Sequence, residues 1–173
     1  DSCMRQLLLD CCALDWSRIS PAIFGSLFQS VMDTTLRRNL GAHYTSEKNI
    51  LKLIKPLFLD ELRAEFERIK TNRKRLEEFH QRLAKLQFLD PACGCGNFLV
   101  IAYRELRLLE LDILRELHKI HKSDFLDVAQ FNILCDVDQF FGIEIEEFPA
   151  QIAQTALWLM DHQMNLRVSE EFG

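Results

Sequence analysis

The sequence lacks the long apolar run that would carry a protein through a membrane. No hydrophobic stretch in its 173 residues approaches the roughly 18 residues that a membrane-spanning helix needs. Its first ten residues, DSCMRQLLLD, have neither the basic start nor the small-residue cleavage site of a secretory signal. Internal repeats and low-complexity segments are also absent. We therefore expect a globular protein without a membrane partner.

Cysteine is present, but not in a pattern that fits cross-linking or metal binding. The six cysteines are irregularly spaced, whereas small secreted folds use a regular disulfide framework. Cys93 and Cys95 are too close together for a usual zinc pair, and the sequence has no second pair. We expect reduced thiols in a cytoplasmic protein and no metal site.

Positive charge is not in excess either. The chain has 21 Lys and Arg against 26 Asp and Glu, which gives a net charge of −5. This balance argues against a protein that binds nucleic acid over its whole surface, although it permits a local basic face. One basic cluster stands out, and a solvated surface explains it better than contact with a DNA backbone: Lys70, Arg73, Lys74 and Arg75.

Helical periodicity fills the first half of the chain. Apolar residues recur at helical spacing from Pro21 to Arg38 and from Glu47 to Leu59. The segment from Asp60 to Gln87 has no Gly or Pro, and it predicts one long helix or two helices with a break near Thr71–Asn72. We expect residues 1–87 to form a helical N-terminal segment.

The pattern changes to strand, helix, strand, helix after this segment. The apolar run Leu86–Leu89 predicts a first buried strand, and Phe98–Ile120 is a strongly amphipathic helix. Phe140–Ile145 predicts a second buried strand, and Pro149 can occupy the first turn of the next helix. This order is typical of the first half of a doubly wound α/β sheet.

The predicted α/β part, residues 88–173, is too short for a complete domain. It contains two strands, whereas an open nucleotide-binding sheet usually has about five or six. The chain also begins without Met. We therefore expect a helix-rich, truncated piece of a larger enzyme, in which the free sheet edge could pair with a second copy.

A glycine-rich segment, DPACGCGNF at residues 90–98, joins the first strand to the long helix. Gly94 and Gly96 allow a tight turn and let the backbone approach a ligand, while the helix start offers free N–H groups. Phe98 is expected to anchor the helix to the sheet. The segment predicts a pocket for a ligand that contains a nucleoside.

An acid follows the second strand. The Glu144 carboxylate is placed to accept hydrogen bonds from both hydroxyls of a ribose, and Ile145 can cover one face of an adenine ring. Glu144 lies much farther from Gly96 than the roughly 20 residues usual in dinucleotide-binding folds, so residues 122–138 are expected to contain an insertion. Two nearby acids compete for the role but fit a solvated helix start better: Glu146 and Glu147.

The segment DPACGCGNF closely resembles the DPA/P-x-G-S-G-x-F loop of amino-group DNA methyltransferases that use S-adenosylmethionine. GAHYTS, residues 41–46, resembles the segment that closes over the methionine end of that cofactor. Together with GIEI, ISPAIFGSLFQS and ALWLMDHQMN, these motifs look like the methyltransferase region of large single-chain restriction–modification enzymes, over roughly residues 16–165. Cys95 stands where the family usually has Ser, and because both side chains are small we expect binding to survive.

The resemblance implies the N-terminal part of a Rossmann-like, S-adenosylmethionine-dependent methyltransferase domain, preceded by helices. In it, Thr45 donates its hydroxyl to the cofactor carboxylate and Tyr44 packs beside it, although a plain helix cap explains Thr45 equally well. The implied cofactor-binding residues are Tyr44, Thr45, Asp90, Pro91, Ala92, Cys93, Gly94, Gly96, Asn97, Phe98, Glu144 and Ile145.

The family's Asn/Asp-Pro-Pro-aromatic tetrad, which holds a flipped target base, has no match here, because no Asn is followed by Pro. We therefore expect this chain to carry half of a cofactor site and no catalytic residues, and we expect target-base binding, catalysis and DNA sequence recognition to lie beyond Gly173.

The parent enzyme is expected to methylate the exocyclic amino group of adenine in DNA, in restriction–modification or phage defence. Methylation of RNA or of a protein amide, and a non-catalytic nucleotide-binding or helical interaction module, remain open. A nicotinamide-dependent dehydrogenase is disfavoured, because Phe98-Leu99 replaces the third glycine of its fingerprint.

Overall fold

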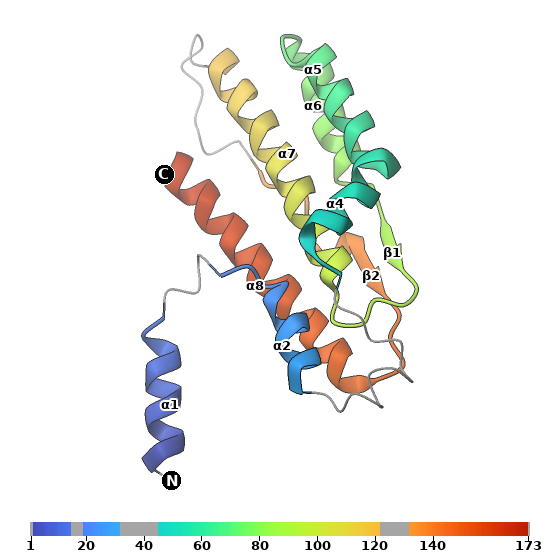
Figure 1. Ribbon diagram of the computed structural model, residues 1–173. Coiled ribbons are helices and arrows are strands. Elements are labelled where there is room, and N and C mark those ends of the chain that lie inside the picture. The colour runs from blue at the N-terminus through green and yellow to red at the C-terminus, as the bar shows by residue number, and fades with distance from the viewer. Residues whose placement is uncertain (1, 15–18, 32–44, 122–131, 173) are drawn as a thin grey trace.

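The computed structural model of the chain describes residues 2–14, 19–31, 45–121 and 132–172 (Figure 1). This part of the chain is mostly helical and contains one small parallel sheet. Its elements are α1 (Ser2–Cys12), α2 (Ile23–Val31), α4 (Glu47–Ile54), the π-helical turn η2 (Lys55–Leu59), α5 (Asp60–Ile69), α6 (Arg73–Leu83), β1 (Phe88–Asp90), α7 (Asn97–His121), the 3-10 turn η4 (Val137–Gln139), β2 (Phe140–Gly142) and α8 (Glu147–Phe172).

The charge-rich segment before the sheet is a helical hairpin. The predicted break near Thr71–Asn72 is confirmed, and Asn72 caps α6 by accepting a hydrogen bond from the N–H of Arg75 at 3.1 Å. The predicted helix Glu47–Leu59 is not a uniform α-helix, because its last five residues form the π-helical turn η2. Pro56 lies in this turn and has no N–H to donate, which is a physical reason for the local change in hydrogen bonding.

The two strands lie parallel, with Phe88 opposite Phe140, Leu89 opposite Phe141 and Asp90 opposite Gly142. Both are shorter than predicted, since β1 begins at Phe88 rather than Leu86 and β2 ends at Gly142 rather than Ile145. The chain bends after β2 because the Glu144 carboxylate accepts hydrogen bonds from the N–H groups of Ile145 and Glu146. The predicted order of strand, helix, strand and helix is therefore confirmed, in a helix-rich fold with a small two-stranded sheet.

Helix α7 lies at the centre of the fold, between α8 and the α5–α6 hairpin (Figure 1). Its predicted bounds are confirmed within one residue. Helix α8 begins at Glu147, so Pro149 lies in its first turn as predicted, and the helix continues to Phe172. One face of the sheet packs on α7: the Phe88 and Phe140 rings stack with centroids 4.7 Å apart, and Tyr103 meets Phe140 edge-on. The helix that carries the glycine loop at its N-terminus is thus fixed on several sides.

A buried charged network, which sequence reasoning missed, ties these helices together. Arg107 and Glu110 are 2% and 1% exposed, and the Arg107 Nε lies 3.1 Å from Glu110 Oε2. The Arg107 guanidinium, on α7, donates hydrogen bonds to the side chains of Asp161 and Asn165 on α8, at 2.9 and 2.7 Å. Buried charges need such partners because leaving water is costly.

Glu110 also holds the chain just before β2. Its Oε1 accepts hydrogen bonds from the backbone N–H groups of Leu134 and Cys135 and lies 2.8 Å from His80 Nε2. Burial raises the pKa of Glu110, but the hydrogen bonds from His80, Leu134 and Cys135 outweigh it and hold the pKa below its usual value. The predicted insertion spans residues 122–138. Residues 122–131 lie outside the described part of the chain, and the remaining residues form the segment that Glu110 holds and the first part of η4.

Candidate cofactor site at the glycine loop

The glycine loop begins with a turn that is bonded both to itself and to the chain leaving β2. Asp90 Oδ1 accepts a hydrogen bond from the N–H of Ala92 at 3.1 Å, which forms the turn through Pro91. The N–H of Ile143 donates to the carbonyl of Asp90 at 2.9 Å, and the N–H of Cys93 donates to the carbonyl of Ile143 at 3.0 Å. These hydrogen bonds therefore join the chain leaving β1 to the chain leaving β2.

The two glycines of the loop serve different purposes. Gly94 has a φ of +53°, and a Cβ built there would meet nothing within 4 Å. Gly96 has a φ of +76°, and a Cβ there would lie 2.7 Å from the Cβ of Ala153 on α8. Both backbones favour glycine. Gly96 in addition permits close packing on α8, while Gly94 leaves open space in front of the loop.

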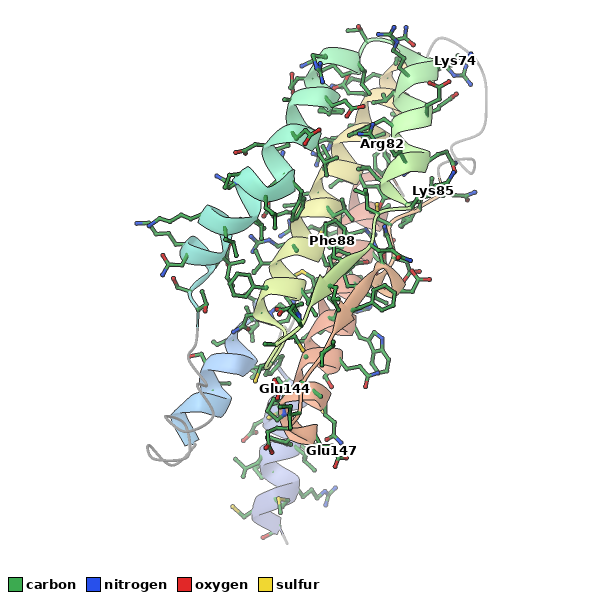
Figure 2. The ribbon with its side chains drawn as sticks, turned by 90° about the vertical axis from the view of Figure 1, so that its right-hand side faces the viewer. Lys74, Arg82, Lys85, Phe88, Glu144 and Glu147 are labelled. Carbon is green, nitrogen blue, oxygen red and sulfur yellow. The ribbon has the colours of Figure 1, made fainter. Side chains whose placement is uncertain are left out.

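The Glu144 carboxylate lies directly at this loop (Figure 2). Its Oε2 accepts a hydrogen bond from the N–H of Gly94 at 2.9 Å. Its Oε1 accepts from the N–H groups of Ile145 and Glu146, at 2.8 and 3.0 Å. The structure thus brings together the two predicted halves of the site, which are 50 residues apart in the sequence.

The neighbouring acids have other surroundings. Glu147 is the first residue of α8, and its Oε1 accepts a hydrogen bond from Gln151 Nε2 at 2.9 Å, as expected for an acid at a helix start. Glu146 is exposed in the bend before α8. Ile145 is 94% exposed, so its side chain is available to a flat ring but contacts little of the described chain.

The two thiols of the loop are held in the neutral form. Burial, followed by the negative charge of Glu144, raises the pKa of Cys95 to about 11. Burial, Asp90 and Glu144 also raise the pKa of Cys93. At neutral pH these side chains therefore add no negative charge to a site that already contains two carboxylates, and they are poor nucleophiles.

Asn97 and Phe98 fix the first turn of α7. The Asn97 side chain packs against α2, where a Cβ on Gly25 would lie 2.8 Å from Asn97 Nδ2. Asn97 Oδ1 is buried and has no hydrogen-bond partner within the described chain. Phe98 was predicted to anchor the helix to the sheet, and that is wrong: it packs against a separate cluster formed by Ala22, Ile50, Ile54 and Ile101, of which Ile50 and Ile54 lie on α4.

The upstream motif is only partly described. Tyr44 lies outside the described residues, and Thr45 is half-buried just before the N-cap of α4. That N-cap is Ser46, whose side chain makes no capping hydrogen bond. Helix α4 packs on α7 through Ile50 and Ile54, which brings the end of the motif to the N-terminal half of the glycine-loop helix.

The catalytic residues are the part of the predicted site that the structure does not test. They are expected beyond Gly173, and Gly173 itself lies outside the described residues, directly after the end of α8 at Phe172. The groups that the described residues bring together are those predicted to bind the cofactor. The place of the catalytic residues therefore stays a prediction.

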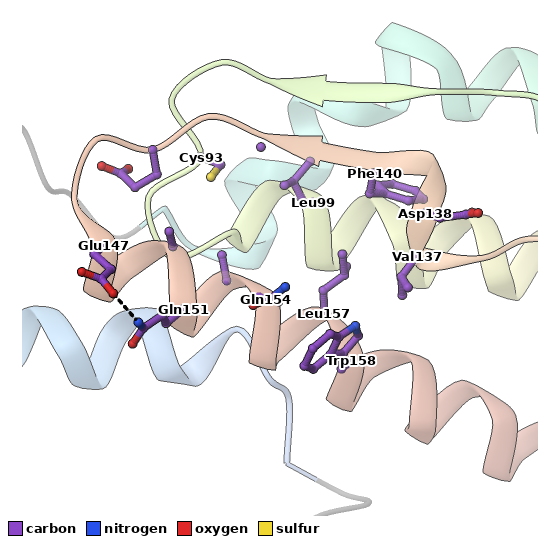
Figure 3. A pocket seen from close by; sticks show the side chains of 14 residues that line it. Cys93, Leu99, Val137, Asp138, Phe140, Glu147, Gln151, Gln154, Leu157 and Trp158 are labelled. Atoms are coloured by element: carbon purple, nitrogen blue, oxygen red, sulfur yellow. Dashed lines mark hydrogen bonds between the residues drawn. The ribbon is translucent and has the colours of Figure 1, made fainter.

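A cavity of about 540 Å³ lies between β2 and α8, beside the loop (Figure 3). Its volume is in the range usual for sites that bind small molecules. The polar residues of its lining include Glu144, Glu147 and Gln151, and Asp138 lies beside Phe140 at the other end (Figure 3). Leu157 and Trp158 are among the apolar residues. The candidate site is therefore a loop, a carboxylate and an adjacent hollow of suitable size.

The basic cluster lies away from this site. Lys74 on α6 is at the far end of the structure from Glu144 (Figure 2). Two of its four cations are paired with acids on the hairpin, Lys70 with Glu67 and Arg73 with Glu77. These contacts favour the solvated surface over a DNA contact.

Among the residues that the structure describes, no three His, Cys, Asp or Glu gather as metal ligands, and no helix is long and apolar enough to cross a membrane.

A glycine turn between a parallel strand and a helix N-terminus, with an acid at the end of the neighbouring strand, is typical of α/β proteins that bind nucleoside-containing cofactors. A family model described as MmeI, DNA-methyltransferase domain, matches residues 66–173. The chain therefore belongs to the family of MmeI DNA-methyltransferase domains.

Individual proteins agree with this assignment. The DNA methyltransferase A of Bacillus subtilis (strain 168) is 43% identical over 168 residues, which cover 96% of this chain and 18% of that protein. A putative type II restriction enzyme and methyltransferase of Methanocaldococcus jannaschii is 26% identical over 168 residues, 82% of this chain and 14% of the relative.

A solved structure is also similar over the whole chain. It is that of the Type IIL restriction–modification enzyme MmeI in complex with DNA, with 69% identity and a TM-score of 0.90, and it covers 100% of this chain and 23% of that one. The chain thus spans about a fifth of the length of the relatives that it matches.

Proposed function

We propose that this chain supplies half of an S-adenosylmethionine site in an enzyme that methylates the exocyclic amino group of adenine in DNA. The observation that carries the proposal is the Glu144 carboxylate held at the Gly94 N–H of a glycine loop. The relatives named above, which are DNA methyltransferases and restriction–modification enzymes, support the reaction class and DNA as the partner. We further infer that the two-stranded sheet belongs to a Rossmann-like domain, with residues 1–87 as its helical N-terminal segment and residues 88–173 as the first half of its α/β part.

The residues of the loop fit such a cofactor. The open space in front of Gly94 lets a ligand approach the backbone. The first N–H groups of a helix such as α7 have no partner within the helix and lie at the positive end of its dipole. The Glu144 carboxylate offers about four lone pairs, and its three backbone bonds leave one, on Oε2, for a ribose hydroxyl. Accepting the second hydroxyl requires one of these backbone N–H groups to give way.

Each residue then has a stated role. Glu144 accepts hydrogen bonds from the ribose hydroxyls, and Ile145 covers one face of the adenine ring. Asp90, Pro91, Ala92 and Cys93 shape the turn, while Gly94 and Gly96 give it room. Thr45 donates to the cofactor carboxylate and Tyr44 packs beside it, while Asn97 and Phe98 fix the helix start.

The chemistry that the cofactor supplies is an activated methyl group for attack by an amine. The chain's own residues bind and orient the cofactor, and proximity and alignment provide much of the rate of such a transfer. The residues described here include no candidate for holding the target base, so we expect base binding, catalysis and sequence recognition to come from parts of the protein beyond Gly173. The enzyme would act in the cytoplasm as part of a restriction–modification system.

Nucleoside analysis tests this proposal. The intact protein is incubated with DNA and methyl-labelled S-adenosylmethionine, and the DNA is digested and examined by mass spectrometry. We expect the label in N6-methyl-2′-deoxyadenosine, and we expect the Glu144→Ala variant to need a higher cofactor concentration for the same rate. Label on cytosine would overturn the adenine assignment alone, whereas transfer to RNA or protein but not to DNA would overturn the substrate class.

A further inference from the structure

Gln139 joins the approach to β2 to the approach to β1 (Figure 2 shows both strands). Gln139 is 5% exposed. Its Nε2 donates to the carbonyls of Leu83 and Leu86, at 2.8 and 2.9 Å, and its Oε1 accepts from the N–H of Asp136 at 2.9 Å. Three of the four hydrogen bonds that a carboxamide can make are therefore used on backbone groups.

These backbone groups stand at the ends of two elements. Leu83 is the last residue of α6, and its carbonyl also accepts a hydrogen bond from the N–H of Leu86 at 3.2 Å; Leu86 lies just before β1. Gln139 itself is the residue before Phe140, the first residue of β2. One side chain thus links the start of β2 to the approach to β1, in a sheet where Phe88 faces Phe140.

The register set there reaches the candidate site within a few residues. A slip by one residue would move Phe140 from the buried face of the sheet to the other face, and would displace the chain by about 3.3 Å. The bonds between Ile143 and both Asp90 and Cys93, and that between Glu144 and Gly94, depend on the present register. Because β1 and β2 are short, their own ladder gives little resistance to such a slip.

We propose that Gln139 is a positioning residue of the cofactor site: its carboxamide sets the register of β2 on β1 and thereby holds the Glu144 carboxylate at the N–H of Gly94. The inference rests on the proposed function for its effect on the cofactor, but its effect on the Gly94 N–H is independent of any ligand.

The test uses two substitutions of the same kind in the intact protein. Gln139→Met keeps the size of the side chain and removes its three hydrogen bonds. Gln163→Met is the matched control, because Gln163 is also a buried glutamine that donates to a backbone carbonyl, that of Ile19, but it lies on α8 away from the strands. Calorimetric titration with S-adenosylmethionine and hydrogen exchange of the peptide containing Gly94 are measured on both.

We expect Gln139→Met to weaken cofactor binding about tenfold, as the loss of one good polar contact would, and to speed exchange in the Gly94 peptide. Gln163→Met should leave both unchanged. In a Glu144→Ala background, Gln139→Met should change affinity by less than about twofold, since the two residues act through one contact. A side chain that only stabilises the fold would weaken binding by the same factor in both backgrounds.

The outcomes separate the two proposals. If the unaltered protein does not bind the cofactor, the proposed function fails, while faster exchange at Gly94 in Gln139→Met still supports the positioning role. If the unaltered protein binds and Gln139→Met leaves affinity and exchange unchanged, the positioning role is overturned. Should the Met variant not fold, Gln139→Asn, whose amide is one methylene shorter, is put through the same measurements and read in the same way.

Discussion

Gly96 and Ala153 touch so closely that a methyl group on Gly96 would lie 2.7 Å from the Cβ of Ala153. The contact joins the glycine loop to α8, 57 residues later in the sequence by their numbers. It is distinct from the contact of Gly94 with Glu144, which faces the open side of the loop. The two glycines should therefore respond differently to the same substitution.

We expect Gly96→Ala to destabilise the protein by roughly 2–5 kcal/mol, because a left-handed backbone and an overpacked contact add their costs. Gly94→Ala should cost only about 1–2 kcal/mol, from its backbone conformation alone. Thermal unfolding of both variants measures the difference. Adding Ala153→Gly should restore part of the Gly96→Ala loss and none of the Gly94→Ala loss, and equal rescue of both would contradict the contact.

The buried pair of Arg107 and Glu110 should be far more sensitive than an exposed pair. Glu110→Ala leaves the Arg107 charge under-compensated in the core, and losses of this kind cost about 3–5 kcal/mol. Glu67→Ala removes the partner of Lys70 on the hairpin, where the Glu67 side chain is 60% exposed, and an ion pair screened by water in this way contributes little to stability. Similar melting temperatures for the two variants would show that the core network is not formed.

The pH dependence of stability should report Glu110 directly. Its pKa in the folded protein lies below the usual 4.5, so the unfolded chain takes up a proton first as the pH falls. The stability that Glu110 contributes is therefore complete above about 4.5 and is lost below that value, as the pH approaches the lower folded pKa. Glu110→Gln should lose less stability between pH 5 and 3 than the unaltered protein, and a steeper loss would contradict the sign.

Cys95 should behave as an unreactive thiol. With a pKa of about 11, only roughly one molecule in a thousand carries the thiolate at pH 8. Alkylation of Cys95, followed by mass spectrometry of its peptide, should speed up about tenfold per pH unit up to pH 10. A plateau below pH 9 would contradict the burial of the thiol beside Glu144. Cys95→Ser should change cofactor affinity by less than about threefold, because both side chains are small and the loop backbone is retained.

The sequence predicted the elements and their order better than their ends. Periodicity located α7 within one residue, because an amphipathic stripe of that length has few alternatives. The limits of β2 depend on the Glu144 side chain, which bends the chain after Gly142, and no local pattern contains that information. The proximity of the glycine loop and Glu144 could be predicted from the sequence, because each directly follows a predicted strand and the ends of parallel strands lie together.

The residues that sequence reasoning missed act across elements. Gln139, Ala153 and Glu110 each serve a contact with a distant segment, and as single residues they match no motif. A buried Gln at the start of a strand is a weak signal until its partners are known. The direction of Phe98 was wrong for a related reason: it depends on how α4 packs, which apolar spacing within α7 does not reveal.

The central claim is tested most directly by titrating the intact protein with S-adenosylmethionine in a calorimeter, with Glu144→Ala and Glu146→Ala as a matched pair. Removing hydrogen bonds from a charged acceptor costs about 1.5–3 kcal/mol, so Glu144→Ala should weaken binding by roughly 10- to 100-fold. Glu146→Ala, which removes an exposed carboxylate two residues away, should bind as the unaltered protein does. Equal affinity of the unaltered protein and Glu144→Ala would contradict the assignment of the ribose to Glu144, and loss of binding in Glu146→Ala alone would transfer that role to the neighbouring acid.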